Sequence, residues 1–116
     1  FHTRFMEPAG EALKEVFREI RFGEMDFPVL FNAVGREKEA GETIPSLLVR
    51  QVSSSVYFED IIRAMADSGV DTIVEIGPGK ALSGFVRKTC KAIRTMNIEK
   101  WEDLDKVVSA LKGEDQ

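Results

Sequence analysis

Thr72-Ile73-Val74-Glu75-Ile76-Gly77-Pro78-Gly79-Lys80 is the stretch that decides the fold. The mostly apolar and β-branched residues 72–76 predict a short buried strand. The two glycines and the proline then predict a turn, and Leu82, Phe85 and Val86 repeat at the spacing of a helix. A strand, a glycine-rich turn and a helix in this order predict an α/β fold built on a parallel sheet.

The glycine-rich turn allows two interpretations. Backbone amides between a strand and a helix can bind a phosphate or another anion. A P-loop, however, would need glycine at position 74, which is Val74, and a dinucleotide-binding turn would need it at position 82, which is Leu82. The residues therefore favour a tight turn that lets the helix pack on the sheet, with anion binding as the alternative.

Hydrophobic patterns place further elements on both sides of this stretch. Ser55 could cap the third expected helix, and Gly69 ends it. Strands that alternate with helices predict a three-layer parallel sheet with flanking helices, whose exposed edge needs a partner. We expect helices at 6–20, 44–52, 58–66 and 101–111, strands at 28–34, 72–76 and 92–96, a charged loop at 35–41 and a disordered tail at 113–116.

Composition excludes several classes of protein. The 116 residues suit one domain, and 16 basic against 20 acidic residues argue against a nucleic-acid binder. No apolar run reaches the ~20 residues of a membrane span and no signal peptide is visible, so we expect a soluble, cytoplasmic protein. Cys90 is the only cysteine and His2 the only histidine, which leaves no internal disulfide and no plausible zinc site.

Two residues stand out as candidates for chemistry. His2 has the usual side chain of a general base, although a solitary histidine near a terminus is more often incidental. Gln51 lies on an apolar helix face, where it either makes a hydrogen bond or faces solvent. Ser53, Ser54 and Ser55 are not flanked by the glycines of a nucleophile elbow. The apolar opening Phe1-His2-Thr3-Arg4-Phe5-Met6 indicates a cut inside a larger folded protein.

Several strings together resemble the malonyl-CoA:acyl carrier protein transacylases, the acyltransferases of fatty-acid and polyketide synthesis. The likeness covers nearly the whole chain in order, but only the family's carboxy-terminal portion, after its small ferredoxin-like subdomain. Modest departures are Ser55, Phe58 and Phe5, where proline, tryptophan and leucine are common, and they put local packing in doubt. The matching strings are Phe1-His2-Thr3-Arg4-Phe5-Met6-Glu7-Pro8-Ala9, Pro28-Val29-Leu30-Phe31-Asn32, Leu48-Val49-Arg50-Gln51-Val52 with Ser54-Ser55-Val56, and Glu75-Ile76-Gly77-Pro78-Gly79-Lys80-Ala81-Leu82-Ser83-Gly84.

The resemblance implies that residues 1–116 are the carboxy-terminal part of an α/β-hydrolase-like large subdomain. A serine would carry the malonyl group from malonyl-CoA to the pantetheine thiol of acyl carrier protein, without a cofactor. It implies that His2 is the general base and that the backbone carbonyl of Gln51 orients it. The serine elbow and the arginine for the malonyl carboxylate are missing, so we expect the chain alone to be inactive and to need the missing amino-terminal part.

Three alternatives remain open. The chain could belong to an acyltransferase domain of a polyketide synthase, where a phenylalanine before the histidine, such as Phe1, favours malonyl. It could instead be a non-catalytic module that binds an anion at Gly77 to Lys80. In a third view it is a structural fragment, and we expect its exposed apolar surface to cause self-association or binding of the missing half.

Overall fold

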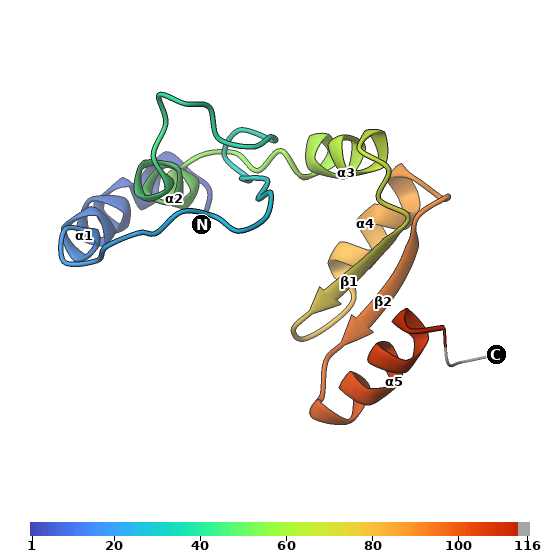
Figure 1. Cartoon of the computed structure of the whole chain (residues 1–116). Coiled ribbons are helices and arrows are strands. Elements are labelled where there is room, and N and C mark those ends of the chain that lie inside the picture. Colours follow the sequence, from blue (N-terminus) through green and yellow to red (C-terminus); the bar gives the residue numbers. More distant parts are fainter. Residues whose placement is uncertain (114–116) are drawn as a thin grey trace. The chain divides into compact units, whose positions relative to one another are not determined.

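The computed structural model describes residues 1–113 of the chain (Figure 1). Its contacts divide it into two compact units, residues 1–61 and residues 62–116. Each unit has its own buried side chains, and one helix, residues 58–67, crosses the boundary between residues 61 and 62.

The first unit is built on a pair of packed helices, α1 (Glu7–Phe17) and α2 (Ile44–Ser53), preceded by the short 3-10 helix η1 (Arg4–Met6). Pro8 lies in the first turn of α1, where its missing N–H costs no hydrogen bond. At the start of α2, the Thr43 hydroxyl accepts from the Ser46 amide and the Ser46 hydroxyl accepts from the Thr43 amide. This reciprocal pair satisfies amides that a helix start leaves unpaired. Phe31, Ala33, Leu47 and Ile61 form the buried core of the unit.

The predicted strand at 28–34 is wrong. Phe31 makes one isolated antiparallel bridge to Arg36, and its carbonyl accepts from the amides of Val34 (3.2 Å) and Gly35 (2.8 Å). The chain therefore reverses here in a tight turn. An apolar run shows that a segment is buried, but it does not distinguish a buried turn from a buried strand.

The second unit holds the sheet, formed by β1 (Thr72–Ile76) and β2 (Arg94–Ile98). The strands are parallel, in register from Thr72 beside Arg94 to Ile76 beside Ile98, and α4 (Ala81–Thr89) connects them. After β2 comes α5 (Trp101–Leu111), and both helices pack against β2 (Figure 1). The buried side chains here are Ile62, Glu75, Ser83, Val86, Ile93 and Val107.

The α/β class, the parallel pairing and the strand at 72–76 are confirmed, whereas the size of the sheet is corrected. Residues 1–113 contain two paired strands instead of three. The second strand begins at Arg94 rather than residue 92, because Ile93 lies buried in the turn before it. A short apolar stretch does not show which of its residues enter the ladder.

The helix predictions were closer to the structure. Helices at 44–52, 58–66 and 101–111 are confirmed, and the first helix ends at Phe17 instead of residue 20. α3 (Phe58–Asp67) begins three residues after Ser55, and Gly69 follows its end with φ +90°. Residues 114–116, most of the tail expected to be disordered, lie outside the described residues.

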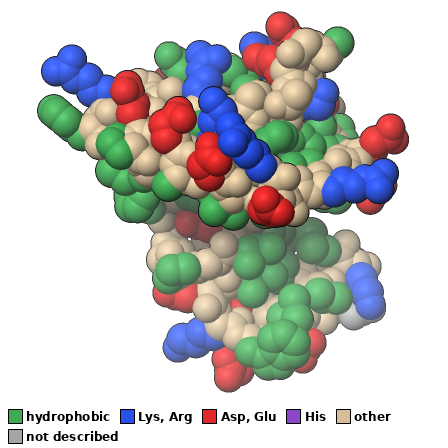
Figure 2. Space-filling view, turned by 90° about the vertical axis from the view of Figure 1, so that its left-hand side faces the viewer, with side chains coloured by type: hydrophobic (Ala, Val, Ile, Leu, Met, Phe, Trp, Pro, Cys, Tyr) green, Lys and Arg blue, Asp and Glu red, His purple; other side chains and the backbone are tan. Residues whose placement is uncertain are grey.

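Large apolar side chains are exposed on both units. In the first, Phe1 is 87% exposed; in the second, Ile76 is 76% and Trp101 is 82% exposed. Figure 2 shows hydrophobic side chains gathered in several areas of the surface. Exposed apolar area of this kind is typical of surfaces that bind other protein.

Candidate active site

The site begins at the carboxyl end of α2. The last carbonyls of a helix have no partner within the helix and must find donors elsewhere. Here His2 supplies two of them, because its backbone N–H donates to the Val52 carbonyl (2.8 Å) and its ring nitrogen Nδ1 lies 2.9 Å from the Gln51 carbonyl. Residues 49 positions apart in the chain are thereby brought together.

The backbone of His2 is held in an unusual conformation. Its φ is +63°, and it is the only residue other than glycine among residues 1–113 with a positive φ. Such a conformation costs an ordinary residue about 1 kcal/mol or more, so surrounding contacts must impose it. The bonds to two successive carbonyls at the end of α2 provide those contacts.

The contact with Gln51 defines which ring nitrogen carries the proton. A backbone carbonyl oxygen can only accept a hydrogen bond, so Nδ1 must donate. The neutral ring then carries its proton on Nδ1 and keeps a free electron pair on Nε2. His2 is exposed, so Nε2 is accessible to a proton donor. The arrangement is that of a histidine poised to accept a proton.

Both candidate residues therefore meet, and Gln51 takes part through its main chain. The expected contact between the Gln51 carbonyl and His2 is present in the structure. Periodicity alone suggested a role for the amide side chain, whereas the resemblance pointed to the carbonyl. Among residues 1–113, no serine hydroxyl is hydrogen-bonded to His2. In the serine run, Ser53 ends α2 and Ser54 has an extended backbone conformation.

The glycine-rich turn already holds a carboxylate of the chain itself. Glu75, only 9% exposed, accepts hydrogen bonds from the amides of Leu82 (3.2 Å) and Ser83 (2.8 Å) in the first turn of α4. The Ser83 hydroxyl (2.6 Å) and the Asn97 side chain (3.1 Å) complete the set. The hydroxyl and amide of Ser83 contribute most to lowering the pKa of the Glu75 carboxyl below its usual value.

A second carboxylate occupies the turn. The Gly79 amide donates to Glu99 at 3.0 Å. With these amides engaged, a phosphate at the start of α4 would meet negative charge instead of free donors. The structure thus supports the tight turn, in which Gly77 and Gly79 have φ of +139° and +82°, over the anion site.

Sequence reasoning missed these roles of the acidic residues. Glu75 lies in the strand predicted at 72–76, and neither Glu75 nor Asp103 was predicted to cap a helix. Asp103 instead accepts from the amides of Lys100 (2.9 Å) and Glu99 (3.0 Å) at the start of α5, and the Lys100 amide contributes most to lowering its pKa. The signal that could have found Asp103 is an acidic residue in the first turn of an expected helix.

The described residues form neither a metal site nor a membrane-spanning helix. Within residues 1–113, no group of three or more histidine, cysteine, aspartate or glutamate side chains is arranged to hold a metal ion. None of the described helices is long and apolar enough to cross a membrane.

The chain is similar to known proteins along nearly its whole length. No family model matches the chain. The malonyl CoA-acyl carrier protein transacylase of Bacillus subtilis is 36% identical over 114 residues, which cover 98% of this chain and 36% of that protein. The crystal structure of the transacylase of the same name from Clostridium perfringens is 39% identical, covering 97% of this chain and 36% of that one, with a TM-score of 0.87.

A third match is a complex. It contains a malonyl-transacylase bound to the acyl-carrier protein of a type II polyketide synthase. The matched chain is 28% identical in sequence to this one, with a TM-score of 0.82. The match covers 97% of this chain and 35% of that one. Along nearly its whole length, the chain is therefore related to the malonyl CoA-acyl carrier protein transacylases, and it spans about 36% of the length of the relatives it matches.

Proposed function

We propose that the chain is the carboxy-terminal part of the large subdomain of a malonyl-CoA:acyl carrier protein transacylase and that His2 is its general base. The observation that carries the proposal is the bond between Nδ1 of His2 and the Gln51 carbonyl, which leaves Nε2 as a proton acceptor. The reaction is assigned from the similarity to transacylases, which covers 98% of the chain.

The transfer proceeds in two steps that reuse the same proton acceptor. In the first, Nε2 of His2 takes the proton of a serine hydroxyl while the serine oxygen attacks the malonyl thioester. The C–S bond breaks, and the proton passes to the leaving CoA thiolate. In the second, the carrier-protein thiol gives its proton to Nε2 and attacks the serine ester, and the serine oxygen recovers the proton.

The nucleophile comes from outside residues 1–116. No serine of the chain has the flanking glycines of an elbow, so the attacking serine belongs to the missing amino-terminal part. The resemblance to the transacylases implies that the arginine for the malonyl carboxylate and the oxyanion-hole donors lie there as well. In the complete protein, β1 and β2 are then part of a larger three-layer, α/β-hydrolase-like sheet in a cytoplasmic enzyme. The reaction needs no cofactor, and the chain alone is inactive.

The carrier protein could serve either of two pathways. Fatty-acid synthesis is favoured by the name shared by the relatives. The polyketide alternative rests on one solved complex, whose malonyl-transacylase is bound to a polyketide-synthase carrier protein. In the polyketide alternative, Phe1, immediately before His2, favours malonyl as the acyl group.

The test is the mass of a longer protein that includes the missing amino-terminal part, after incubation with malonyl-CoA. A malonyl adduct is expected on that protein and not on the 116-residue chain. Replacing His2 with alanine should slow its formation by several orders of magnitude, on the order of 10⁴-fold or more. Lys112→Ala, which changes an exposed residue at the end of α5, serves as the matched control and should react normally. A folded longer protein that forms no adduct would exclude the transacylase proposal.

A further inference from the structure

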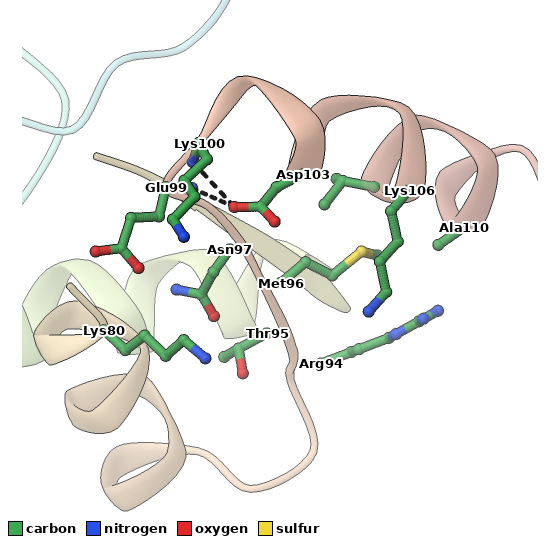
Figure 3. A pocket seen from close by; sticks show the side chains of 11 residues that line it. Lys80, Arg94, Thr95, Met96, Asn97, Glu99, Lys100, Asp103, Lys106 and Ala110 are labelled. Atoms are coloured by element: carbon green, nitrogen blue, oxygen red, sulfur yellow. Dashed lines mark hydrogen bonds between the residues drawn. The ribbon is translucent and has the colours of Figure 1, made fainter. Parts of the chain in front are cut away.

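A pocket of about 460 Å³ lies in the second unit, along the outer side of β2. Residues 94–97 of β2 form its floor, the facing side of α5 forms one wall, and Lys80 at the start of α4 closes another (Figure 3). Its volume is within the ~300–1,000 Å³ range of ligand sites.

The pocket is basic although the chain as a whole carries a net charge of −4. Its lining contains the four cations Lys80, Arg94, Lys100 and Lys106 and two acids. Both acids are engaged by backbone amides, Glu99 by that of Gly79 and Asp103 by those of Glu99 and Lys100. The four cations have no ion pair within residues 1–113.

Two of the cations come from neighbouring elements that line the pocket. In Figure 3 the side chain of Lys106 extends from α5 toward that of Arg94 on β2. Asp103 interacts electrostatically with Lys106, but neither cation is within ion-pair distance of an acid among residues 1–113. A carboxylate placed near both side chains would therefore be attracted by two positive charges.

The floor of the pocket is an open strand edge. In a parallel strand, alternate residues direct both N–H and C=O to the same side. Arg94 and Ile98 bond toward β1, since the Arg94 amide donates to Asp71 and the Ile98 carbonyl accepts from Gly77. Thr95 and Asn97 therefore direct their amides and carbonyls to the outer edge, where residues 1–113 supply no further strand.

We propose that this pocket binds an extended acidic peptide segment, which adds to the open edge of β2 as a further strand. Its backbone would bond to Thr95 and Asn97, and its carboxylates would lie against Arg94 and Lys106. The proposal does not depend on the transacylase activity.

A peptide fits the pocket better than a free anion does. The outer edge presents carbonyl acceptors as well as amide donors, and a phosphate can satisfy only the donors. Lysine and arginine on an edge strand can also serve simply to prevent pairing with other chains. That explanation requires the edge to reject acidic and basic peptides alike.

Amide NMR of the isotopically labelled 116-residue chain tests the proposal. The probe is a peptide of about eight residues in which glutamate alternates with threonine, compared with one in which lysine replaces glutamate. The acidic peptide is expected to shift the Thr95 and Asn97 amide signals and to slow their hydrogen exchange. The basic peptide should do neither. Replacing Arg94 and Lys106 together with glutamate should weaken binding about tenfold or more.

Matched variants distinguish weaker binding caused by the lost positive charge from weaker binding caused by unfolding. Lys88→Glu changes an exposed cation of α4 outside the pocket and should bind as the native chain does. If the double variant loses its dispersed amide spectrum, Lys106→Glu alone replaces it, with a smaller but measurable loss. Equal binding of the two peptides, unaffected binding by a folded charge-reversed variant, or no shift at Thr95 and Asn97 would each overturn the proposal.

Discussion

At the scale of single residues, the end of one helix determines the chemistry of His2. Carbonyls of Gln51 and Val52 that α2 leaves unpaired hold its ring and its backbone, at 2.9 and 2.8 Å. The positive φ of His2 is therefore imposed by a segment distant in sequence. No glycine or asparagine at position 2 signals it locally, so sequence patterns could not predict it.

Gly35 gives a sharp test of the first unit at this scale. Its φ is +68°, and a β-carbon there would lie 2.9 Å from Cβ of Asp60 and 3.0 Å from Cβ of Tyr57. Strain and steric overlap act together, so Gly35→Ala is expected to lower the free energy of unfolding by about 2 kcal/mol or more. Denaturant titration measures the change. Gly23→Ala, with nothing within 4 Å of its β-carbon, is the control and should be close to neutral.

Glu42 should make stability depend on pH. It accepts from Arg36 at 2.8 and 3.1 Å and from the Glu39 amide at 2.8 Å, and the Arg36 side chain contributes most to lowering its pKa from 4.5 to about 2. A carboxyl whose pKa is lower in the folded than in the unfolded state stabilises the fold above the unfolded pKa. That stabilisation is lost as the pH falls toward the folded pKa.

The expected result is a difference between the native chain and Glu42→Gln that is constant above about pH 5 and shrinks as the pH falls from 4.5 toward 2. Unfolding free energies measured across this range give the comparison. Glu24→Gln, an exposed residue without an ion pair among residues 1–113, is the control. A difference that stays the same down to pH 2 would show that Glu42 is not held as described.

At the scale of elements, β1, α4 and β2 are joined by one polar cluster. Glu75 at the end of β1 accepts from Ser83 of α4 and from Asn97 of β2, and Asn97 also donates to the Ser83 hydroxyl at 2.9 Å. The sequence predicted the strand, turn and helix because their periodicities change sharply at Gly77. The internal cap could not be predicted in the same way, because it depends on a residue of β2 that lies 22 positions away.

Removing the hydroxyl at the centre of this cluster should destabilise the second unit. Ser83 is 1% exposed, so Ser83→Ala leaves Glu75 and Asn97 with one partner fewer in a buried place. The expected loss is about 1–3 kcal/mol of unfolding free energy, measured by thermal or chemical denaturation. Ser68→Ala removes an exposed hydroxyl bonded to the Met65 carbonyl and should change stability by less than about 0.5 kcal/mol. Equal effects of the two changes would contradict the proposed role of the cluster.

At the scale of the whole molecule, the chain exposes several large apolar side chains. It spans 36% of the length of the relative from Bacillus subtilis, and the sheet of residues 1–113 has two strands. The alternation of strands and helices predicted a parallel sheet, but it overcounted the strands because the buried turn at 28–34 resembles a strand in composition.

We therefore expect the isolated chain to self-associate. Light scattering coupled to size-exclusion chromatography should show a mass that rises with protein concentration, together with strong binding of a dye for apolar surfaces. Since apolar contacts are insensitive to screening, the association should persist in about 1 M NaCl. A monomer at all concentrations with little dye binding would contradict this expectation.

The state of the His2 ring tests the central claim most directly. His2 is the only histidine of the chain, so its imidazole signals can be assigned without ambiguity. Long-range nitrogen–proton NMR of the 116-residue chain, at a pH where the ring is neutral, identifies the protonated nitrogen. Our account expects the proton on Nδ1, bonded to the Gln51 carbonyl, with Nε2 unprotonated. A ring that carries its proton mainly on Nε2 would contradict it, because the nitrogen assigned to accept the serine proton would already be occupied.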